Sequence, residues 1–298
     1  MVEKMITLVM PAFNEEKNIK KSIESIKKQT FENFELIIVN DGSTDNTVTV
    51  IEREIENDPR IKFINPKKKL GKNGAINVAF EYIRGDWLYF MGADDILPSN
   101  ALYLWDKATS NLNPSEPLAL RGRMKITSDM KKYDGLILPK NRKKVNLSGP
   151  LLLQSRGMFK FTFPLPEEFP NEDTWWSLCI NAFAHQIICI DDIIVYYNIH
   201  DGNSISRNDS YAIFTEKYHR RYIARKKFLE SFENIISKKY KMRLENELYM
   251  EELRWNKKTL KIIFLRNVSI IDKLRCIVFS NKCLYTIKIK FDRFFLGH

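Results

Sequence analysis

The 298-residue chain is poor in several features that define common protein classes. Its four cysteines form no CxxC pair and have no zinc-ligand spacing, so we expect free thiols in a reducing compartment rather than a disulfide framework. No uncharged apolar run is long enough to cross a bilayer. The apolar stretch 5–13 is followed at once by polar and acidic residues, without a small-residue cleavage site, and therefore predicts a first strand rather than a signal peptide.

The sequence also lacks both common glycine-rich phosphate-binding loops. Neither GxGxxG nor GxxxxGK[ST] occurs. If the chain binds a nucleoside diphosphate, the phosphate charge must therefore be neutralised by another group. A divalent cation held by hard oxygen ligands, Mg²⁺ or Mn²⁺, is the expected group.

Acidic residues are scarce in the last third of the chain. The composition, 44% hydrophobic and 29% charged, is that of an ordered globular protein, and the net charge is +11. Residues 207–298 hold 22 Lys and Arg against 10 Asp and Glu, a net charge of +12, whereas residues 1–206 have a net charge of −1. This asymmetry predicts that the C-terminal part faces an anionic partner.

Strand and helix patterns alternate along the first hundred residues. Apolar runs predict buried strands at 5–10, 34–39, 61–64 and 87–91. Amphipathic helices are predicted over 15–28 and from Gly71 to about Gly85. Such alternation with short connections predicts an α/β fold with a mostly parallel, Rossmann-like sheet flanked by helices.

The strand at 87–91 leads through Gly92 and Ala93 into two adjacent carboxylates, Asp94 and Asp95. Ionised carboxylates at the edge of a core are costly unless they are hydrogen-bonded, paired or bound to a cation. Asp41 follows the second strand, and ligands of α/β sheets lie at such strand ends. These acids therefore predict a cation and ligand site, the alternative being that each one caps the following helix.

Six segments occur in a familiar order, and they are PAFNEE (11–16), VNDGSTDNT (39–47), GKNGAIN (71–77), YFMGADD (89–95), NED followed by tryptophans (171–176) and IHDGNSIS (199–206). On these segments the chain resembles the family-2 glycosyltransferases of the GT-A fold, especially bacterial enzymes of surface-polysaccharide assembly. The resemblance covers about residues 5–206. It implies a GT-A catalytic domain over 1–206 and leaves 207–298 as a basic helical extension.

The resemblance assigns roles to particular residues. The expected nucleotide-sugar contacts are Pro11, Ala12, Asn14, Glu16, Asp41, Asn77 and Asp94. Asp41 would accept a hydrogen bond from uracil, Asp94 and His200 would bind the cation, and Asp173 would be the general base. Further candidate contacts with donor or acceptor are Asp95, Glu172, Trp175, Trp176 and Arg207.

Three departures from the family pattern bear on these roles. Gly92 replaces the first acid of the DxD motif, although this variant is known among family members. Ile76 replaces an arginine that precedes Asn77 in many members, and the absence of QxxRW argues against a processive polymerase.

An alternative role for Asp173 is in a helix start capped by Asn171, with the two tryptophans in the core.

The resemblance implies a metal-dependent, inverting transfer of a sugar from a nucleotide donor, expected to be UDP-linked, to a hydroxyl of a glycan or lipid-linked glycan. A silent nucleotide-sugar-binding scaffold and, less well supported, a sugar nucleotidyltransferase are the alternatives.

Segment 253–298 has 11 basic residues against Asp272 and Asp292, interleaved with Ile and Phe. This pattern predicts peripheral binding to the anionic cytoplasmic face of the plasma membrane, the alternative being a helical cap with a solvated basic face. No recognised motif supports nucleic-acid binding.

Overall fold

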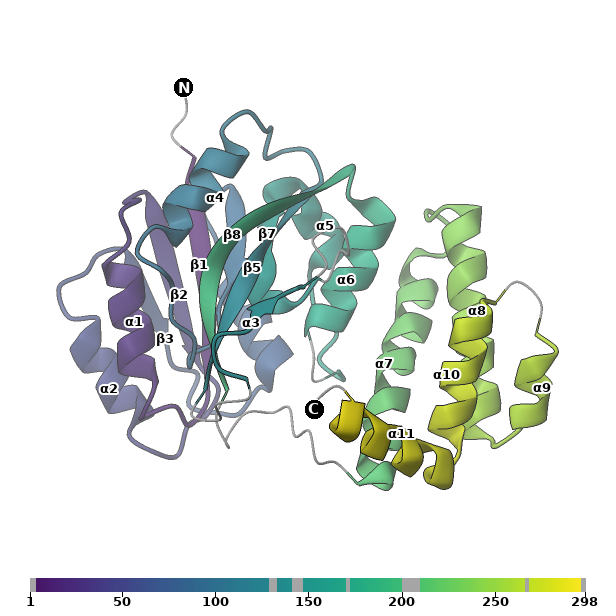
Figure 1. Cartoon of the computed structure of the whole chain (residues 1–298). Coiled ribbons are helices and arrows are strands. Elements are labelled where there is room, and N and C mark those ends of the chain that lie inside the picture. The colour runs from purple at the N-terminus through teal and green to yellow at the C-terminus, as the bar shows by residue number, and fades with distance from the viewer. Residues whose placement is uncertain are drawn as a thin grey trace. The chain divides into compact units, whose positions relative to one another are not determined.

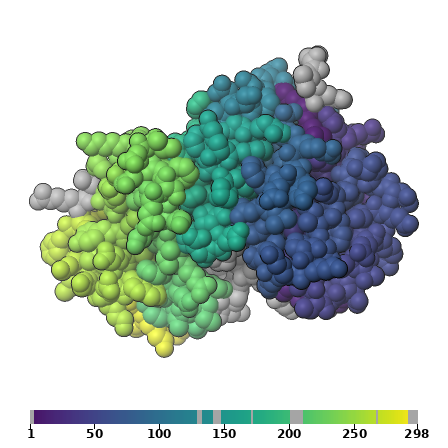
Figure 2. All heavy atoms as spheres, turned by 180° about the vertical axis from the view of Figure 1, so that it is seen from behind, coloured from purple at the N-terminus to yellow at the C-terminus, as the bar shows by residue number. Residues whose placement is uncertain are grey.

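The structure is a computed structural model that describes residues 4–128, 133–140, 147–169, 172–199, 210–265 and 268–295. The chain divides into two compact units, Met1–Asp201 and Gly202–His298. Figure 1 labels the helices and strands of each unit, and in Figures 1 and 2 the helices of the second unit are green to yellow. The two units are described separately below.

Four neighbouring parallel strands form one half of the sheet in the first unit. They are β3 (Ile61–Ile64), β2 (Phe34–Asn40), β1 (Ile6–Ala12) and β4 (Trp87–Phe90), in that spatial order. The apolar runs of the sequence predicted all four, and their limits agree within two residues. Because β1 pairs in parallel with both β2 and β4, the carboxyl ends of these three strands meet at one edge of the sheet.

The other half of the sheet is mixed in direction. It contains β7 (Leu152–Ser155), β5 (Leu118–Ser128), β6 (Ile137–Leu138) and β8 (Gln186–Ile199). β7 runs antiparallel to both β4 and β5, β6 is antiparallel to β5, and β8 is parallel to β5. The predicted α/β class is confirmed, and the sheet is mixed because β7 enters it in the opposite direction.

The helices of the first unit are α1 (Ile19–Lys27), α2 (Thr47–Glu54), α3 (Lys72–Phe80), α4 (Ala101–Thr109), α5 (Phe159–Thr162) and α6 (Glu172–Phe183), with short 3₁₀ turns η1 (Gly149–Leu151) and η2 (Arg156–Met158). α1 begins later than predicted because the carbonyl of Glu15 accepts from Asn18 and Ile19 in a preceding turn. Its apolar face, Ile19, Ile23 and Ile26, is buried as the periodicity predicted.

A buried carboxylate near the start of β2 bonds to β1 and to the segment before β4. It lies at the opposite end of these strands from their carboxyl ends. Glu35 accepts hydrogen bonds from Thr7 Oγ1 at 2.6 Å and from the backbone N and Nε of Arg84, both at 2.7 Å. Burial alone would raise the pKa of Glu35, but these donors and the Arg84 charge hold that pKa below its ordinary value. Glu35 is therefore a stabilising ionised group in the core.

The second unit is helical. Its elements are α7 (Tyr211–Phe232), α8 (Lys238–Trp255), α9 (Thr259–Ile263), α10 (Ile270–Ser280) and α11 (Lys282–Phe295). Ser210, Ser237 and Ser269 cap α7, α8 and α10 by accepting from backbone N–H groups of the first turns. Among the residues that the structure describes, no helix is both long and apolar enough to span a bilayer.

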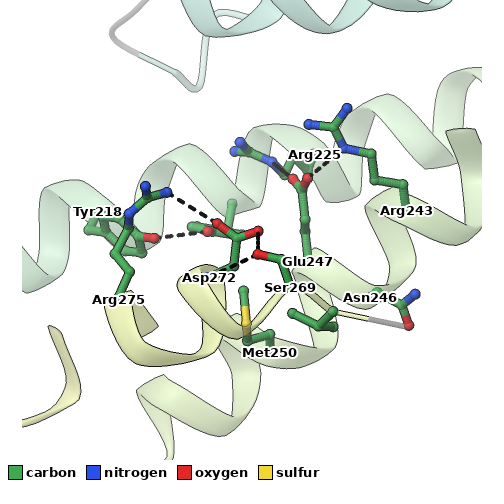
Figure 3. Close-up of a pocket in the computed structure, with 11 residues that line it drawn as sticks. Tyr218, Arg225, Arg243, Asn246, Glu247, Met250, Ser269, Asp272 and Arg275 are labelled. Carbon is green, nitrogen blue, oxygen red and sulfur yellow. Dashed lines mark hydrogen bonds and ion pairs between the residues drawn. The ribbon is translucent and has the colours of Figure 1, made fainter. Parts of the chain in front are cut away.

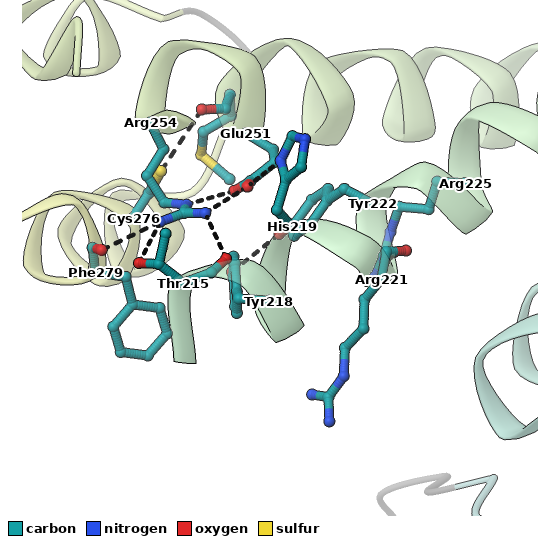
Figure 4. Close-up of polar contacts among 11 residues, drawn as sticks. Thr215, Tyr218, His219, Arg221, Tyr222, Arg225, Glu251, Arg254, Cys276 and Phe279 are labelled. Atoms are coloured by element: carbon teal, nitrogen blue, oxygen red, sulfur yellow. Dashed lines mark hydrogen bonds and ion pairs between the residues drawn. The ribbon is translucent and has the colours of Figure 1, made fainter. Parts of the chain in front are cut away.

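An ion cluster lies at the centre of this unit (Figure 4). Arg254 makes a bidentate pair with Glu251, from Nε and Nη2, with both distances at 2.6 Å. Arg254 Nη1 also donates to the carbonyl of Phe279, and His219 Nδ1 lies 2.9 Å from Glu251 Oε1. The cluster joins α7, α8 and α10 by a buried ion pair and its hydrogen bonds, beside the apolar packing of Met250, Leu253 and Ile262.

Candidate functional site

Two loops are bonded together at the carboxyl ends of β1 and β2. The backbone N–H of Asp41 donates to the carbonyl of Ala12 at 2.8 Å. Asn14, at φ 55°, donates its N–H to Ser43 Oγ at 3.0 Å and accepts from Thr44 N through Oδ1 at 2.8 Å. The structure thus brings together the predicted nucleoside loop, Pro11 to Asn14, and the loop that carries Asp41.

Glu16 reaches across to the start of α2. Its Oε2 accepts from both the backbone N and the Nδ2 of Asn46, at 3.0 Å each. The N–H of Glu16 in turn donates to Asp45 Oδ2 at 3.2 Å. Glu16 therefore fixes the two loops in register, and its direct contact with a nucleoside stays a prediction.

Asp41 fastens a third loop, the one that leads into α3. The buried side chain accepts through Oδ1 from Leu70 N at 2.6 Å and Gly71 N at 2.8 Å. The close approach requires Gly42, since a Cβ there would lie 2.9 Å from Lys69 N and the residue has φ 72°. Asp41 therefore sits where three loops converge.

The carboxylates after β4 are held in a tight turn against β8. Asp95 is 1% exposed, its Oδ1 accepts from Asn198 N at 3.3 Å, and its Oδ2 has no hydrogen-bond partner. Burial, together with the charge of Asp94, raises the pKa of Asp95 well above its ordinary value. A buried carboxylate oxygen without a donor calls for an explanation, and a bound cation is one.

Gly92 gives these carboxylates room. A Cβ added at Gly92 would lie 2.7 Å from Asp94 Oδ1 and 2.8 Å from Asp95 Oδ2. The position that carries the first acid of DxD in the related family is thus overlaid here by the two following carboxylates. A side chain at position 92 would therefore have to displace these carboxylates.

The acid pair fits a divalent cation. Asp94 is half-buried beside Asp95, whose orphaned oxygen is of the hard type that Mg²⁺ and Mn²⁺ prefer. Within the described ranges, no three His, Cys, Asp or Glu side chains gather as a possible metal site. His200 and Arg207, the other predicted contributors, lie outside the described residues.

A lysine ties this region to the start of α6. Lys72 Nζ lies 2.9 and 2.8 Å from the two carboxylate oxygens of Glu172, which is only 3% exposed. The same ammonium stands 4.8 Å from the ring centroid of Phe90, the last residue of β4, and its charge moderates the pKa increase at Asp95. Lys72 therefore connects the acids after β4 with the helix that begins at Glu172 and Asp173.

Sequence reasoning singled out Glu172 but missed Lys72, although the sequence contains a signal. Lys72 is the first residue of α3, where the positive end of the helix dipole disfavours a cation. A lysine at this position is expected to have an acidic partner. Asp173, the predicted base, is half-buried in the first turn of α6 and accepts from Thr174 Oγ1 at 3.4 Å.

Two asparagines of α3 hold the segment that precedes α6. Asn77 donates Nδ2 to the carbonyl of Leu165 at 2.9 Å and accepts from Leu165 N at 2.8 Å. Asn73 donates to the carbonyls of Pro166 and Phe169 at 2.8 and 2.7 Å. Both polar atoms of Asn77 thus bind backbone, and this geometry lends no support to its predicted donor contact.

The tryptophans of α6 are core residues. Trp175 and Trp176 are both buried, and the Trp176 ring packs against Phe90 and Phe163 at centroid distances of 5.6 and 6.2 Å. Neither indole presents a face on which a sugar ring stacks in this conformation. The structure supports the alternative in which they anchor α6, and with it Asp173, to the sheet.

A separate cavity of about 410 Å³ lies in the second unit between α7, α8 and α10 (Figure 3). Its charged lining is largely self-paired. Arg225 and Arg243 both bind Glu247, at 2.9 and 3.0 Å, and Arg275 binds Asp272 at 3.3 Å. The charged side chains that line the cavity thus form an ion-pair network where the three helices meet.

Comparison with known proteins finds a family match in part of the first unit. Residues 7–105 match the model of glycosyl transferase family 2, as the sequence motifs predicted. The fold is that of GT-A glycosyltransferases. The chain is 38% identical over 99 residues to an Escherichia coli protein described as UDP-Glc:alpha-D-GlcNAc-diphosphoundecaprenol beta-1,3-glucosyltransferase WfgD. This match covers 33% of this chain and 38% of that protein.

Two solved structures are similar over most of the chain. TarS residues 1–349 from S. aureus, in complex with UDP-GlcNAc, align with a TM-score of 0.61 at 19% identity, covering 93% of this chain and 79% of that one. The mannosyltransferase PcManGT from Pyrobaculum calidifontis, with GDP-Man and Mn²⁺, aligns with a TM-score of 0.60 at 14% identity, covering 100% and 89%. At these identities the likeness is one of fold.

Proposed function

We propose that this protein is a metal-dependent, inverting glycosyltransferase that uses a nucleotide-sugar donor, with UDP as the nucleotide. The observation that carries the proposal is the buried, unpartnered oxygen of Asp95 beside Asp94, at the sheet edge where Asp41 also lies. The family match over residues 7–105 supports the same activity. The Mn²⁺ in the PcManGT complex supports a divalent cation.

The proposed roles are those that the resemblance to family-2 glycosyltransferases assigns to these residues. Asp41 and the loop from Pro11 to Asn14 bind the nucleoside, and Asp94 would hold the cation together with His200. When bound, the cation would supply positive charge that offsets the diphosphate. Asp173 takes the proton of the acceptor hydroxyl as its oxygen bonds to the anomeric carbon and the bond to the diphosphate breaks. One such displacement inverts the anomeric centre.

We further propose that the acceptor is a hydroxyl of a glycan or lipid-linked glycan in bacterial surface-polysaccharide synthesis. The match to WfgD, whose name specifies a diphosphoundecaprenol-linked acceptor, supports this assignment. The match spans less than two fifths of that relative's length. The charge of +12 on residues 207–298 favours a peripheral position at the anionic cytoplasmic membrane face.

The test pairs two isosteric substitutions with two readouts. Thermal shift with UDP-sugars and Mn²⁺ measures donor binding, since a ligand of the native state raises its apparent stability. Asp94→Asn should abolish the Mn²⁺-dependent part of this shift. Asp173→Asn should keep the shift while transfer to acceptor falls by about 10²–10⁴-fold, the usual contribution of a general base. Donor binding that is indifferent to both EDTA and Asp94→Asn refutes the site.

Gly92 favours one second candidate, a nucleotide-sugar-binding scaffold without transfer activity. The loss of the first DxD acid removes one ligand from the site. A transferase leaks slowly by hydrolysing its donor in the presence of Mn²⁺, whereas a scaffold binds the donor without turnover. Donor hydrolysis that depends on Asp94 therefore separates the two.

A further inference from the structure

Six large apolar side chains form an exposed surface on two neighbouring helices of the second unit. We call it the α9–α10 apolar face, and its members are Leu260, Ile263, Phe264, Ile270, Ile271 and Leu274. They are 51–82% exposed, with Phe264 at the upper limit. Single exposed apolar residues are ordinary, but six such residues on two packed helices of one unit indicate a surface that binds something.

The packing of these helices does not require this face. Ile262 and Cys276 point inward and are buried with Met250 and Leu253 of α8. α9 is thus apolar on both its inner and outer sides, although it is only five residues long. A helix that merely covers a core needs one apolar side, so the outer set requires a separate explanation.

Basic residues adjoin the face in the sequence. Over residues 256–275 the sequence has six Lys and Arg and a single acid, Asp272. Lys257, Lys258 and Lys261 are exposed beside α9, and Lys273 Nζ donates to the carbonyl of Ile263, which joins α10 to the end of α9. Asp272 is engaged by the Ser269 hydroxyl and Arg275.

Exposed apolar side chains with exposed lysines close by complement an anionic lipid surface. Lysine stems lie along the apolar boundary while the ammonium groups reach the headgroups. A second copy of the same face fits poorly, because the lysines of one copy would then face the lysines of the other.

We propose that the α9–α10 apolar face inserts into the interface of an anionic bilayer and seats the second unit on the membrane. This rests on the membrane association in the proposed function and names the residues that perform it. The lysines supply salt-sensitive attraction, and the six apolar residues supply affinity that salt leaves in place.

The experiment uses the full chain with two matched triple variants. One replaces three members of the face, Ile263→Ser, Phe264→Ser and Ile271→Ser. The control replaces three exposed apolar residues elsewhere in the same unit, Ile223→Ser, Ile235→Ser and Met242→Ser. Circular dichroism establishes that both retain their helix content. Co-sedimentation uses vesicles of equal parts phosphatidylcholine and phosphatidylglycerol, against vesicles of phosphatidylcholine alone.

Wild-type and control proteins should bind the anionic vesicles, and the face variant should bind about a hundredfold more weakly at moderate salt. Binding should weaken but persist for wild type in high salt, where the face variant should lose it. Equal vesicle binding by the face variant and wild type overturns the inference. So does a lipid-independent change of oligomeric state in the face variant, measured by sedimentation velocity, because the occupant is then a second copy.

The donor thermal shift, measured on the same samples, separates this inference from the proposed function. Donor binding by a wild-type protein that ignores anionic vesicles refutes the membrane seat alone. Vesicle binding without any donor shift refutes the proposed catalytic site and leaves the face as assigned.

Discussion

Removing the ammonium of Lys72 should destabilise the first unit through Glu172. In Lys72→Met the apolar stem is kept, so the ring of Phe90 still has a neighbour. In the wild-type protein the Glu172 carboxylate is 3% exposed and its two oxygens lie 2.9 and 2.8 Å from the Lys72 ammonium. The substitution removes this positive charge. Asp95 loses a favourable charge as well, which moves its pKa further upward.

The magnitude follows from the burial of the two partners. Breaking a fully buried ion pair by removing one partner costs about 3–5 kcal/mol. The Lys72 side chain is 44% exposed, so water already screens part of the attraction, and we expect a loss of about 1–3 kcal/mol. A loss of about 2 kcal/mol corresponds to about 4–8 °C in the transition of a unit of this size.

A double-mutant cycle measures the pair directly. Thermal unfolding, followed by circular dichroism, is compared for wild type, Lys72→Met, Glu172→Gln and the double variant. Because glutamine is neutral, the double variant should be more stable than Lys72→Met alone. Additive losses in the cycle, or a Lys72→Met protein within about 0.5 kcal/mol of wild type, would refute the linkage.

Three further substitutions test other buried charges. Glu35→Gln should cost about 1–3 kcal/mol in urea unfolding at neutral pH. Since the pKa of Glu35 is held below its ordinary value of about 4.3, its contribution is present above that value and lost as the pH falls through the folded pKa, so the difference from wild type should shrink in acid. The raised pKa of Asp95 has the opposite sign, so ionisation destabilises the native state as the pH rises above the ordinary carboxyl pKa of about 3.9. Asp95→Asn should flatten the dependence of stability on pH above that value and remove the Mn²⁺-dependent thermal shift. Arg254→Met leaves Glu251 buried without its bidentate partner and should destabilise the second unit by about 3–5 kcal/mol. The loss should appear as faster hydrogen exchange in α7 and α8. Unchanged exchange in these helices would show that the ion cluster does not stabilise them.

The first half of the sheet could be predicted because its signals are local. β1, β2 and β4 are mainly apolar runs bounded by polar turns, and strands buried on both faces show that pattern, whereas β3 is shorter and only partly buried. The converging strand ends then follow from parallel pairing. β7, Leu152–Ser155, is only four residues long, and so short a run does not show in which direction a strand pairs. Its antiparallel position between β4 and β5 could therefore not be predicted from the sequence.

The contacts that hold the candidate site are long-range. Lys72 and Glu172 are 100 residues apart, and Asn77 reaches Leu165 across 88 residues. No periodicity encodes such pairs, and only the unfavourable place of Lys72 at a helix start hinted at one. In the same way, Arg254 and Glu251 count as surface charges in a sequence tally, although both are buried.

Gly92 also limits how much negative charge the turn after β4 carries. A Cβ added at this position would point at the oxygens of Asp94 and Asp95. These oxygens are flexible side-chain ends, so bulk alone would be tolerated, whereas an aspartate would bring a third carboxylate beside the other two. Like charges raise each other's pKa, and such a triple would depend more strongly on a neutralising cation. The glycine therefore keeps the turn within the charge that two carboxylates bring.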